Sequence, residues 1–183
     1  HIMGYDISLR RKEAEMIVVM TNGCMRHDAA PGYSDEGMWR PYMSGSMDGT
    51  FEQMFEEVVS WVDDHYRTKA QRAMRASAGL SMGGGHSYNI SRTYANTFDY
   101  VGLFSAAAGN LDNEEVQNSL KAQRDNGFKL YWIACGKTDF LYQANKDAMK
   151  YMDSINFPYT YRESDEGHIW RNWRIYLSEF APM

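Results

Sequence analysis

The chain has 183 residues, a formal net charge of −5 and a hydrophobic content of 44%. This length predicts one globular domain over residues 1–183 with a single substantial core. The acidic balance argues against a nucleic-acid partner, because such proteins normally carry a basic face. No apolar run approaches the roughly 18–20 residues that cross a bilayer. We therefore expect neither a nucleic-acid partner nor a membrane partner.

The cysteines and histidines indicate neither a disulfide framework nor a metal centre. The two cysteines, Cys24 and Cys135, match no spaced motif, and Cys135 lies in an apolar segment where it reads as a small buried hydrophobe. The five histidines are scattered along the chain, so we expect no metal. Residues 1–3 resemble a cloning remnant and no signal peptide is seen, so the sequence leaves the compartment open.

The first third of the chain predicts one strand and one helix on either side of a long loop. Residues 7–15 have the composition of the end of a helix. The unbroken apolar run 16–20 predicts a strand that is buried on both faces of a parallel sheet. The glycine-rich stretch 24–50 predicts a surface loop. Thr50 then predicts the N-cap of an amphipathic helix over 51–66, with Gln53 completing a capping box.

The rest of the chain alternates between strand-like and helix-like segments. Such alternation predicts an α/β sandwich of three layers with a mostly parallel sheet of about five strands. The expected strands are 75–78, 98–105, 128–135 and 159–162, and the expected helices are 83–94, 113–124, 141–155 and 171–180.

One short motif suggests a catalytic serine. Gly79, Ser81 and Gly83 fit the pattern G-x-S-x-G, in which a strand turns sharply into a helix and presents a serine hydroxyl. We expect both glycines to be required because the turn leaves no room for a side chain on either shoulder. Gly84 and Gly85 should let the following helix pack closely.

A serine nucleophile needs a base to take its proton and a carboxylate to orient that base. Asp139 follows the strand 128–135 and His168 follows the strand 159–162, so Ser81, Asp139 and His168 occur in the order used by α/β-hydrolases. Asp139 could equally cap the helix that begins after it. Asp165 and Glu166 are close enough to His168 in sequence to flank it rather than to support it. Of the remaining histidines, His27, His65 and His86, none follows the last strand.

The negative charge of a tetrahedral intermediate needs hydrogen-bond donors. The backbone N–H of Met82, directly after the serine, is the first candidate. A second donor usually comes from a His-Gly-Gly loop after an earlier strand, and the sequence contains no such segment.

These segments together resemble the bacterial feruloyl and acetyl-xylan esterases within the esterase-D-like α/β-hydrolases. The resemblance rests on residues 16–23, 78–85, 98–107, 135–139 and 167–174. It implies an α/β-hydrolase fold, a triad of Ser81, Asp139 and His168, no cofactor, and hydrolysis of feruloyl or acetyl esters on plant cell-wall polysaccharide. It also suggests a secreted bacterial protein.

The sequence departs from this family at its start. Family members begin with strands and an oxyanion loop that would precede residue 1, and the strand before that loop normally lies between the strands expected at 16–20 and 75–78. Either the chain is truncated, or its first strand pairs directly with the strand before Ser81. We therefore expect weak activity unless a partner chain, such as a second copy in a homo-oligomer, supplies the second donor.

Three functions remain open from the sequence. They are a serine esterase, an inactive domain kept for binding or assembly, and an acyltransferase that uses the same acyl-enzyme. For the first, Trp170 and Trp39 are candidate substrate contacts, because Trp170 is close to His168 and Trp39 lies in the long loop. Each tryptophan could equally be a residue that packs in the hydrophobic core.

Overall fold

The computed structural model describes residues 2–3, 16–21, 23 and 48–183. The chain divides into two compact units, 1–68 and 69–183. The predicted helix end at 7–15 and nearly all of the predicted loop at 24–50 lie outside the described residues.

In the first unit, the apolar run 16–20 does not form the predicted buried parallel strand. Only β2 (Val18–Val19) is a strand, and it pairs antiparallel with β1 (Ile2–Met3) in a separate two-stranded sheet. The side chains of Met16, Ile17, Val19 and Met20 are between 38% and 47% exposed. The prediction was wrong because an apolar run indicates a strand but carries no information about its partner.

The helix predicted over 51–66 is present but interrupted. It consists of α2 (Thr50–Gln53) and α3 (Phe55–His65), with Met54 between them. The predicted capping box does not form, because Gly49 is the N-cap and Thr50 is already helical. Asp48 takes the capping role instead, since its Oδ1 accepts hydrogen bonds from the backbone N–H of Thr50 at 3.0 Å and from its hydroxyl at 2.6 Å.

The second unit contains the alternating elements that the sequence predicts. After the short 3₁₀ helix η4 (Arg72–Met74), its four strands are β3 (Ala76–Leu80), β4 (Tyr100–Phe104), β5 (Leu130–Gly136) and β6 (Thr160–Ser164). They are all parallel and lie in the order β3-β4-β5-β6. The helices are α4 (Met82–Thr93), α5 (Glu114–Asn126), α6 (Tyr142–Ser154) and α7 (Trp170–Phe180).

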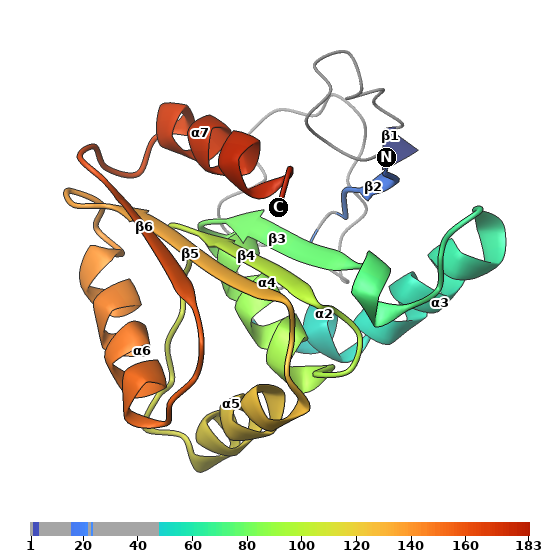
Figure 1. Ribbon diagram of the computed structural model, residues 1–183, viewed down its shortest axis with the longest axis horizontal. Helices are drawn as coiled ribbons and strands as arrows, with labels where there is room; N and C mark the ends of the chain where they lie inside the picture. The colour runs from blue at the N-terminus through green and yellow to red at the C-terminus, as the bar shows by residue number, and fades with distance from the viewer. Residues whose placement is uncertain (1, 4–15, 22, 24–47) are drawn as a thin grey trace. The chain divides into compact units, whose positions relative to one another are not determined.

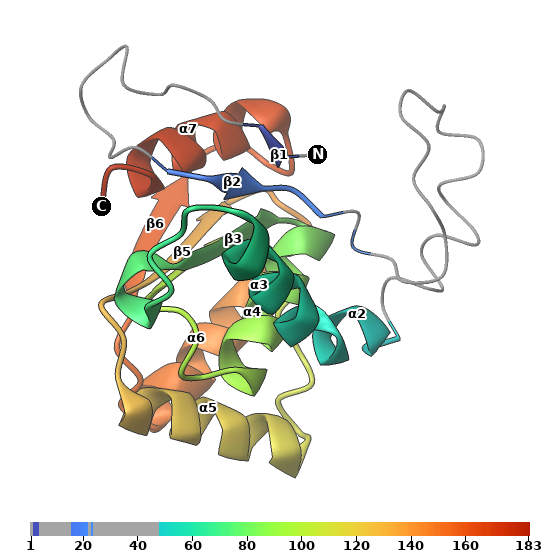
Figure 2. The same cartoon turned by 90° about the vertical axis from the view of Figure 1, so that its right-hand side faces the viewer.

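The helices cover the sheet on both faces, which makes three layers. Figures 1 and 2 show α4, α5 and α6 on one face and α7 on the other. The three-layer α/β prediction is confirmed, although in the part of the chain that the structure describes the parallel sheet has four strands rather than about five. Among the described residues, no helix is both long enough and apolar enough to cross a membrane.

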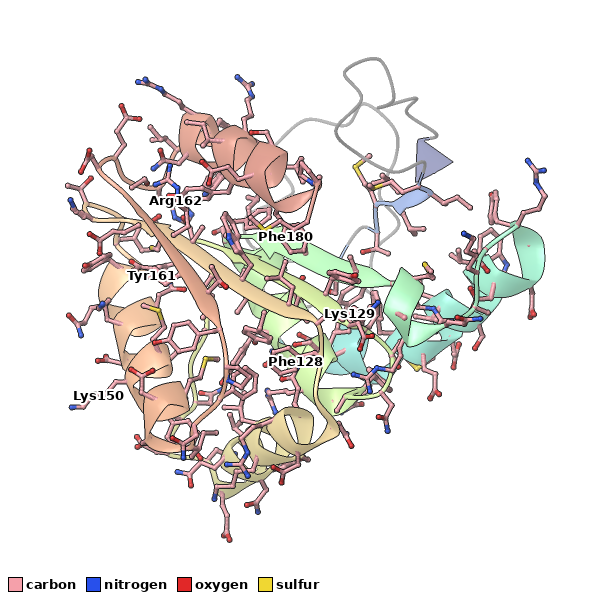
Figure 3. The ribbon with its side chains drawn as sticks, in the orientation of Figure 1. Phe128, Lys129, Lys150, Tyr161, Arg162 and Phe180 are labelled. Atoms are coloured by element: carbon pink, nitrogen blue, oxygen red, sulfur yellow. The ribbon has the colours of Figure 1, made fainter. Side chains whose placement is uncertain are left out.

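Both faces of the central strands are buried, as parallel strands require. Alternate residues face α7, where an aromatic cluster includes Phe104, Trp132, Tyr176 and Phe180. Phe180 is labelled between α7 and the sheet in Figure 3. The residues between them, such as Ile133, point to the opposite face and are also buried. This core fixes the carboxyl ends of the strands, where the candidate site lies.

Candidate active site

Ser81 lies at a sharp turn between β3 and α4. Its φ of 53° and ψ of −118° lie outside the regions that residues with a side chain normally occupy. The backbone N–H of Ser81 donates to the carbonyl of Phe104 at 2.9 Å, and the Ser81 carbonyl accepts from Ala107 at 3.2 Å. These bonds to the end of β4 hold the strained turn in place, and such strain is typical of a nucleophile elbow.

The glycines around Ser81 have unequal roles. A Cβ on Gly79 would overlap the carbonyl of Gly83, so the turn does exclude a side chain there. Nothing lies within 4 Å of the corresponding position on Gly83, so the prediction that both shoulders need glycine was wrong for Gly83. The predicted close packing of the helix holds, since a Cβ on Gly84 would be 2.8 Å from the Ala106 Cβ, and one on Gly85 would be 3.1 Å from the Ala107 carbonyl oxygen.

The structure brings Ser81, His168 and Asp139 into one hydrogen-bond chain. The Oγ of Ser81 lies 2.8 Å from Nε2 of His168. On the other side of the imidazole, Nδ1 lies 2.9 Å from Oδ2 and 3.0 Å from Oδ1 of Asp139. An ionised carboxylate only accepts hydrogen bonds, so Nδ1 carries the proton and Nε2 is left to accept the serine hydroxyl.

Asp139 contacts both His168 and the backbone that leads into α6, but it is not the helix cap, because the N-cap of α6 is Leu141 and this helix has no side-chain cap. Its carboxylate is fully buried and faces His168, whose side chain is 18% exposed. The same carboxylate accepts the backbone N–H of Leu141 at 2.8 Å, just before α6 begins. This second bond helps to fix the orientation of the carboxylate toward His168.

The loops that carry Asp139 and His168 pack directly on each other. They follow β5 and β6, which are paired in parallel with Gly136 opposite Ser164. A Cβ on Gly136 would overlap the carbonyl of Glu166, so the close approach of the two loops requires glycine there. The N–H of Lys137 also donates to the Ser164 carbonyl at 2.8 Å. Parallel strands end at the same sheet edge, which is why residues 29 positions apart in sequence meet.

The two acidic residues beside His168 lie outside the hydrogen-bond chain. Asp165 pairs with Lys137 at 2.9 Å, and the Lys137 ammonium holds the pKa of that carboxyl below its usual range. Glu166 pairs with Arg171 at 2.9 Å. They flank the histidine, as the sequence indicates.

Two aromatic residues that the sequence did not single out contact the His168 ring. The centroid of the Phe140 ring lies 4.4 Å from that of the imidazole, and the indole of Trp173 lies 4.8 Å away in a T-shaped arrangement. Phe140 directly follows Asp139 in the sequence, and this adjacency is the signal from which its place beside the His168 ring could have been predicted. Trp170 is 63% exposed and packs on Trp173 at 5.2 Å, whereas Trp39 lies outside the described residues.

The other predicted residues have simpler surroundings. Met82 is the first residue of α4, so its backbone N–H lies at the helix N-terminus directly after Ser81. Cys135 is fully buried, as predicted, and burial raises the pKa of its thiol to about 12.

The remaining histidines are His27, His65 and His86. His86 is buried within α4, His65 contacts the carbonyl of Trp61, and His27 lies outside the described residues. In the described part of the chain, no three His, Cys, Asp or Glu residues are placed to hold a metal ion.

Comparison with known proteins identifies the family of this chain. The model of a family named Esterase, with the description "Putative esterase", matches residues 4–182. An acetyl esterase of Caldicellulosiruptor saccharolyticus is 27% identical over 97 residues, which cover 49% of this chain and 36% of that protein.

Solved structures show the same fold. A ferulic acid esterase is 25% identical with a TM-score of 0.61, covering 72% of this chain and 59% of that one. An S-formylglutathione hydrolase of Staphylococcus aureus is also 25% identical, with a TM-score of 0.61 and coverage of 70% and 58%. A ferulic acid esterase of Anaeromyces mucronatus in complex with ferulic acid is 20% identical with a TM-score of 0.73, covering 94% and 66%. The α/β-hydrolase fold is thus confirmed, and this chain spans only 36% of the acetyl esterase and 59% of the first ferulic acid esterase.

Proposed function

We propose that this chain, which belongs to the Esterase family, hydrolyses carboxylic esters with Ser81 as nucleophile, His168 as general base and Asp139 as the carboxylate that orients the histidine. The observation that carries the proposal is the unbroken chain of hydrogen bonds from the Ser81 hydroxyl through both nitrogens of His168 to the buried carboxylate. Each link has the length of a well-formed hydrogen bond.

The chemistry follows from this geometry. Ser81 Oγ attacks the carbonyl carbon of the ester while its proton passes to Nε2 of His168. The buried carboxylate of Asp139 stabilises the imidazolium that forms, because its negative charge lies next to Nδ1 and is itself shielded from solvent. His168 then gives the proton to the departing alcohol oxygen, which leaves an acyl group on Ser81. Water activated by the same histidine attacks this acyl-enzyme and releases the acid.

The backbone N–H of Met82 is the proposed donor to the oxyanion. Its place at the start of α4 favours this role, since the N-terminus of a helix carries partial positive charge. A donor of this kind contributes about 2.7–4 kcal/mol to transition-state stabilisation.

The proposed substrates are feruloyl or acetyl esters of plant cell-wall polysaccharide. Support comes from the names of the proteins that this chain is similar to, an acetyl esterase and a ferulic acid esterase. Neither acyl group requires a cofactor for hydrolysis by an activated serine.

The test combines active-site labelling with turnover. The wild-type protein should react with a fluorophosphonate probe and should release product from methyl ferulate or from 4-nitrophenyl acetate. Ser81→Ala should abolish the labelling and the turnover. Ser178→Ala provides the matched control, since the Ser178 hydroxyl only bonds the carbonyl of Ile175 within α7. If neither ester is hydrolysed in a Ser81-dependent manner, the esterase proposal is wrong.

A further inference from the structure

Phe140 combines two properties that are rarely found together. Its side chain is 76% exposed, which is the highest value among the large hydrophobic residues that the structure describes as exposed. Its ring nevertheless packs on the imidazole of His168, with 4.4 Å between the centroids and 47° between the planes. The ring therefore contributes little to the core and presents most of its surface beside the proposed general base. An aromatic face that is exposed beside a reactive group is available for contact with a bound molecule.

The chemistry of the histidine decides which part of a substrate lies there. In acylation, His168 Nε2 must pass its proton to the oxygen of the departing alcohol. That oxygen therefore has to approach Nε2, and the carbon atoms bonded to it pass beside the imidazole. The acyl carbon is instead bonded to Ser81 and its oxygen points toward the oxyanion donor. A side chain that packs on His168 is thus placed for the alcohol and not for the acyl group.

We propose that Phe140 forms the leaving-group subsite, and that the alcohol it accepts is a sugar ring. This inference rests on the proposed esterase function and adds the side of the ester that Phe140 recognises. A flat, exposed aromatic face complements a saturated ring that presents C–H groups on one face and hydroxyls at its rim. A second exposed aromatic residue, Trp170, packs on Trp173, which also contacts the His168 ring.

Kinetics can distinguish a role of Phe140 in binding the alcohol from a purely structural role. The kcat/KM of an ester includes every step up to release of the alcohol, whereas deacylation begins after the alcohol has left. Removing Phe140 should therefore lower kcat/KM for esters of a sugar more than for esters of methanol with the same acyl group. It should leave the deacylation rate of a shared acyl-enzyme unchanged.

The experiment compares methyl ferulate with the ferulate ester of arabinose in the wild-type protein, Phe140→Ala and Phe140→Tyr. For Phe140→Ala we expect kcat/KM to fall about tenfold with the arabinose ester and by no more than about twofold with methyl ferulate. Phe140→Tyr keeps the aromatic face and should restore most of the activity toward the arabinose ester. Met74→Ala is the matched control, because Met74 is 58% exposed but precedes β3, at the edge of the sheet opposite the site.

Equal losses with both esters would overturn the inference, since Phe140 would then act only by positioning His168. No loss with either ester would overturn it as well. If the wild-type protein shows no Ser81-dependent hydrolysis of either ester, the proposed esterase function fails, and the subsite fails with it. Hydrolysis of both esters with no selective effect of Phe140→Ala leaves the proposed function standing and removes only the subsite.

Discussion

The indole of Trp173 donates its Nε1–H to the hydroxyl oxygen of Ser105, with 3.1 Å between the two atoms. Ser105 is fully buried at the end of β4 and adopts a positive φ of 47°, which is unfavourable for a residue with a side chain. The same indole packs on the ring of His168, with 4.8 Å between the centroids. Ser105, which follows β4, the neighbour of β5, therefore fixes the aromatic side chain that forms one wall of the proposed catalytic site.

Trp173→Phe tests this relationship. The substitution keeps an aromatic ring but leaves the buried Ser105 hydroxyl without its indole donor, so we expect the free energy of unfolding to fall by about 1–3 kcal/mol. A looser wall should let the imidazole move, and kcat should then fall about tenfold while KM changes little. Urea unfolding and steady-state kinetics measure the two effects. Trp61→Phe, at a 50% exposed tryptophan, is the control. An unchanged kcat would show that the indole does not position His168.

Asp139→Asn should inactivate the protein while leaving it folded. The asparagine carbonyl can still accept the N–H of Leu141, which turns the amide NH₂ toward Nδ1 of His168. Nδ1 must then accept, so Nε2 carries the proton and can no longer take one from Ser81. We expect kcat to fall about 10³–10⁴-fold. Thermal unfolding should shift by only a few degrees, and full retention of activity would remove Asp139 from the mechanism.

Gly79→Ala and Gly83→Ala form a matched pair on the two shoulders of Ser81. The first places a methyl group on the Gly83 carbonyl, so it should cost about 2–4 kcal/mol of stability. The second enters open space in the first turn of α4, where alanine is a better helix former than glycine, so stability should hold or rise by up to about 1 kcal/mol. Chemical denaturation of both variants checks this. Equal destabilisation would mean that the turn is constrained on both sides.

Features that depend on local sequence patterns could be predicted, whereas features that depend on long-range contacts could not. Asp139 and His168 lie after β5 and β6, as the sequence indicates, because each follows a strand with a clear local pattern and the carboxyl ends of parallel strands meet at one sheet edge. The helices over 113–124 and 141–155 were likewise found near their observed bounds, Glu114–Asn126 and Tyr142–Ser154, from their amphipathic pattern.

The errors concern partners, which no local pattern specifies. The apolar run at 16–20 does indicate extended backbone, but its pairing with Ile2–Met3 depends on a segment remote in sequence. The contacts of Phe140 and Trp173 with His168 are also made through space, across loops whose approach depends on Gly136. The requirement for glycine at 83 was inferred from the motif, whereas the geometry places the restriction at Gly79 alone.

Arg72 should be important for the stability of the second unit. Its Nε donates to the Asp99 carboxylate at 2.6 Å, and its guanidinium also bonds the Gly127 carbonyl. The Asp99 side chain is only 11% exposed. Arg72→Ala would leave this carboxylate without its partner, and we expect the free energy of unfolding to fall by about 2–4 kcal/mol. Arg171→Ala, which removes an exposed pair with Glu166, should cost less than about 1 kcal/mol. Equal losses in urea unfolding would contradict this ranking.

The buried Cys135 thiol should make stability fall at alkaline pH. Burial raises its pKa from 9.0 to about 12, and burial also raises the pKa of Tyr88 from 10.0 to about 12. Each group loses its proton more readily when the chain is unfolded, so its contribution is complete below the unfolded pKa and is lost as pH rises from about 9 toward 12. The urea midpoint should therefore fall over this range, and Cys135→Ala should make the fall shallower.

The same shift predicts that Cys135 is chemically inert in the folded protein. Because burial raises the pKa of the thiol to about 12, almost none of it is ionised at pH 8, and the thiolate is the form that reacts. In a Cys24→Ser background, where Cys135 is the remaining cysteine, iodoacetamide should label the protein in urea but not in native buffer. Arg72→Ala in the same background should speed the labelling, because it raises the fraction of unfolded molecules. Rapid labelling of the native protein at the rate of a free thiol would show that the carboxyl end of β5 opens to solvent.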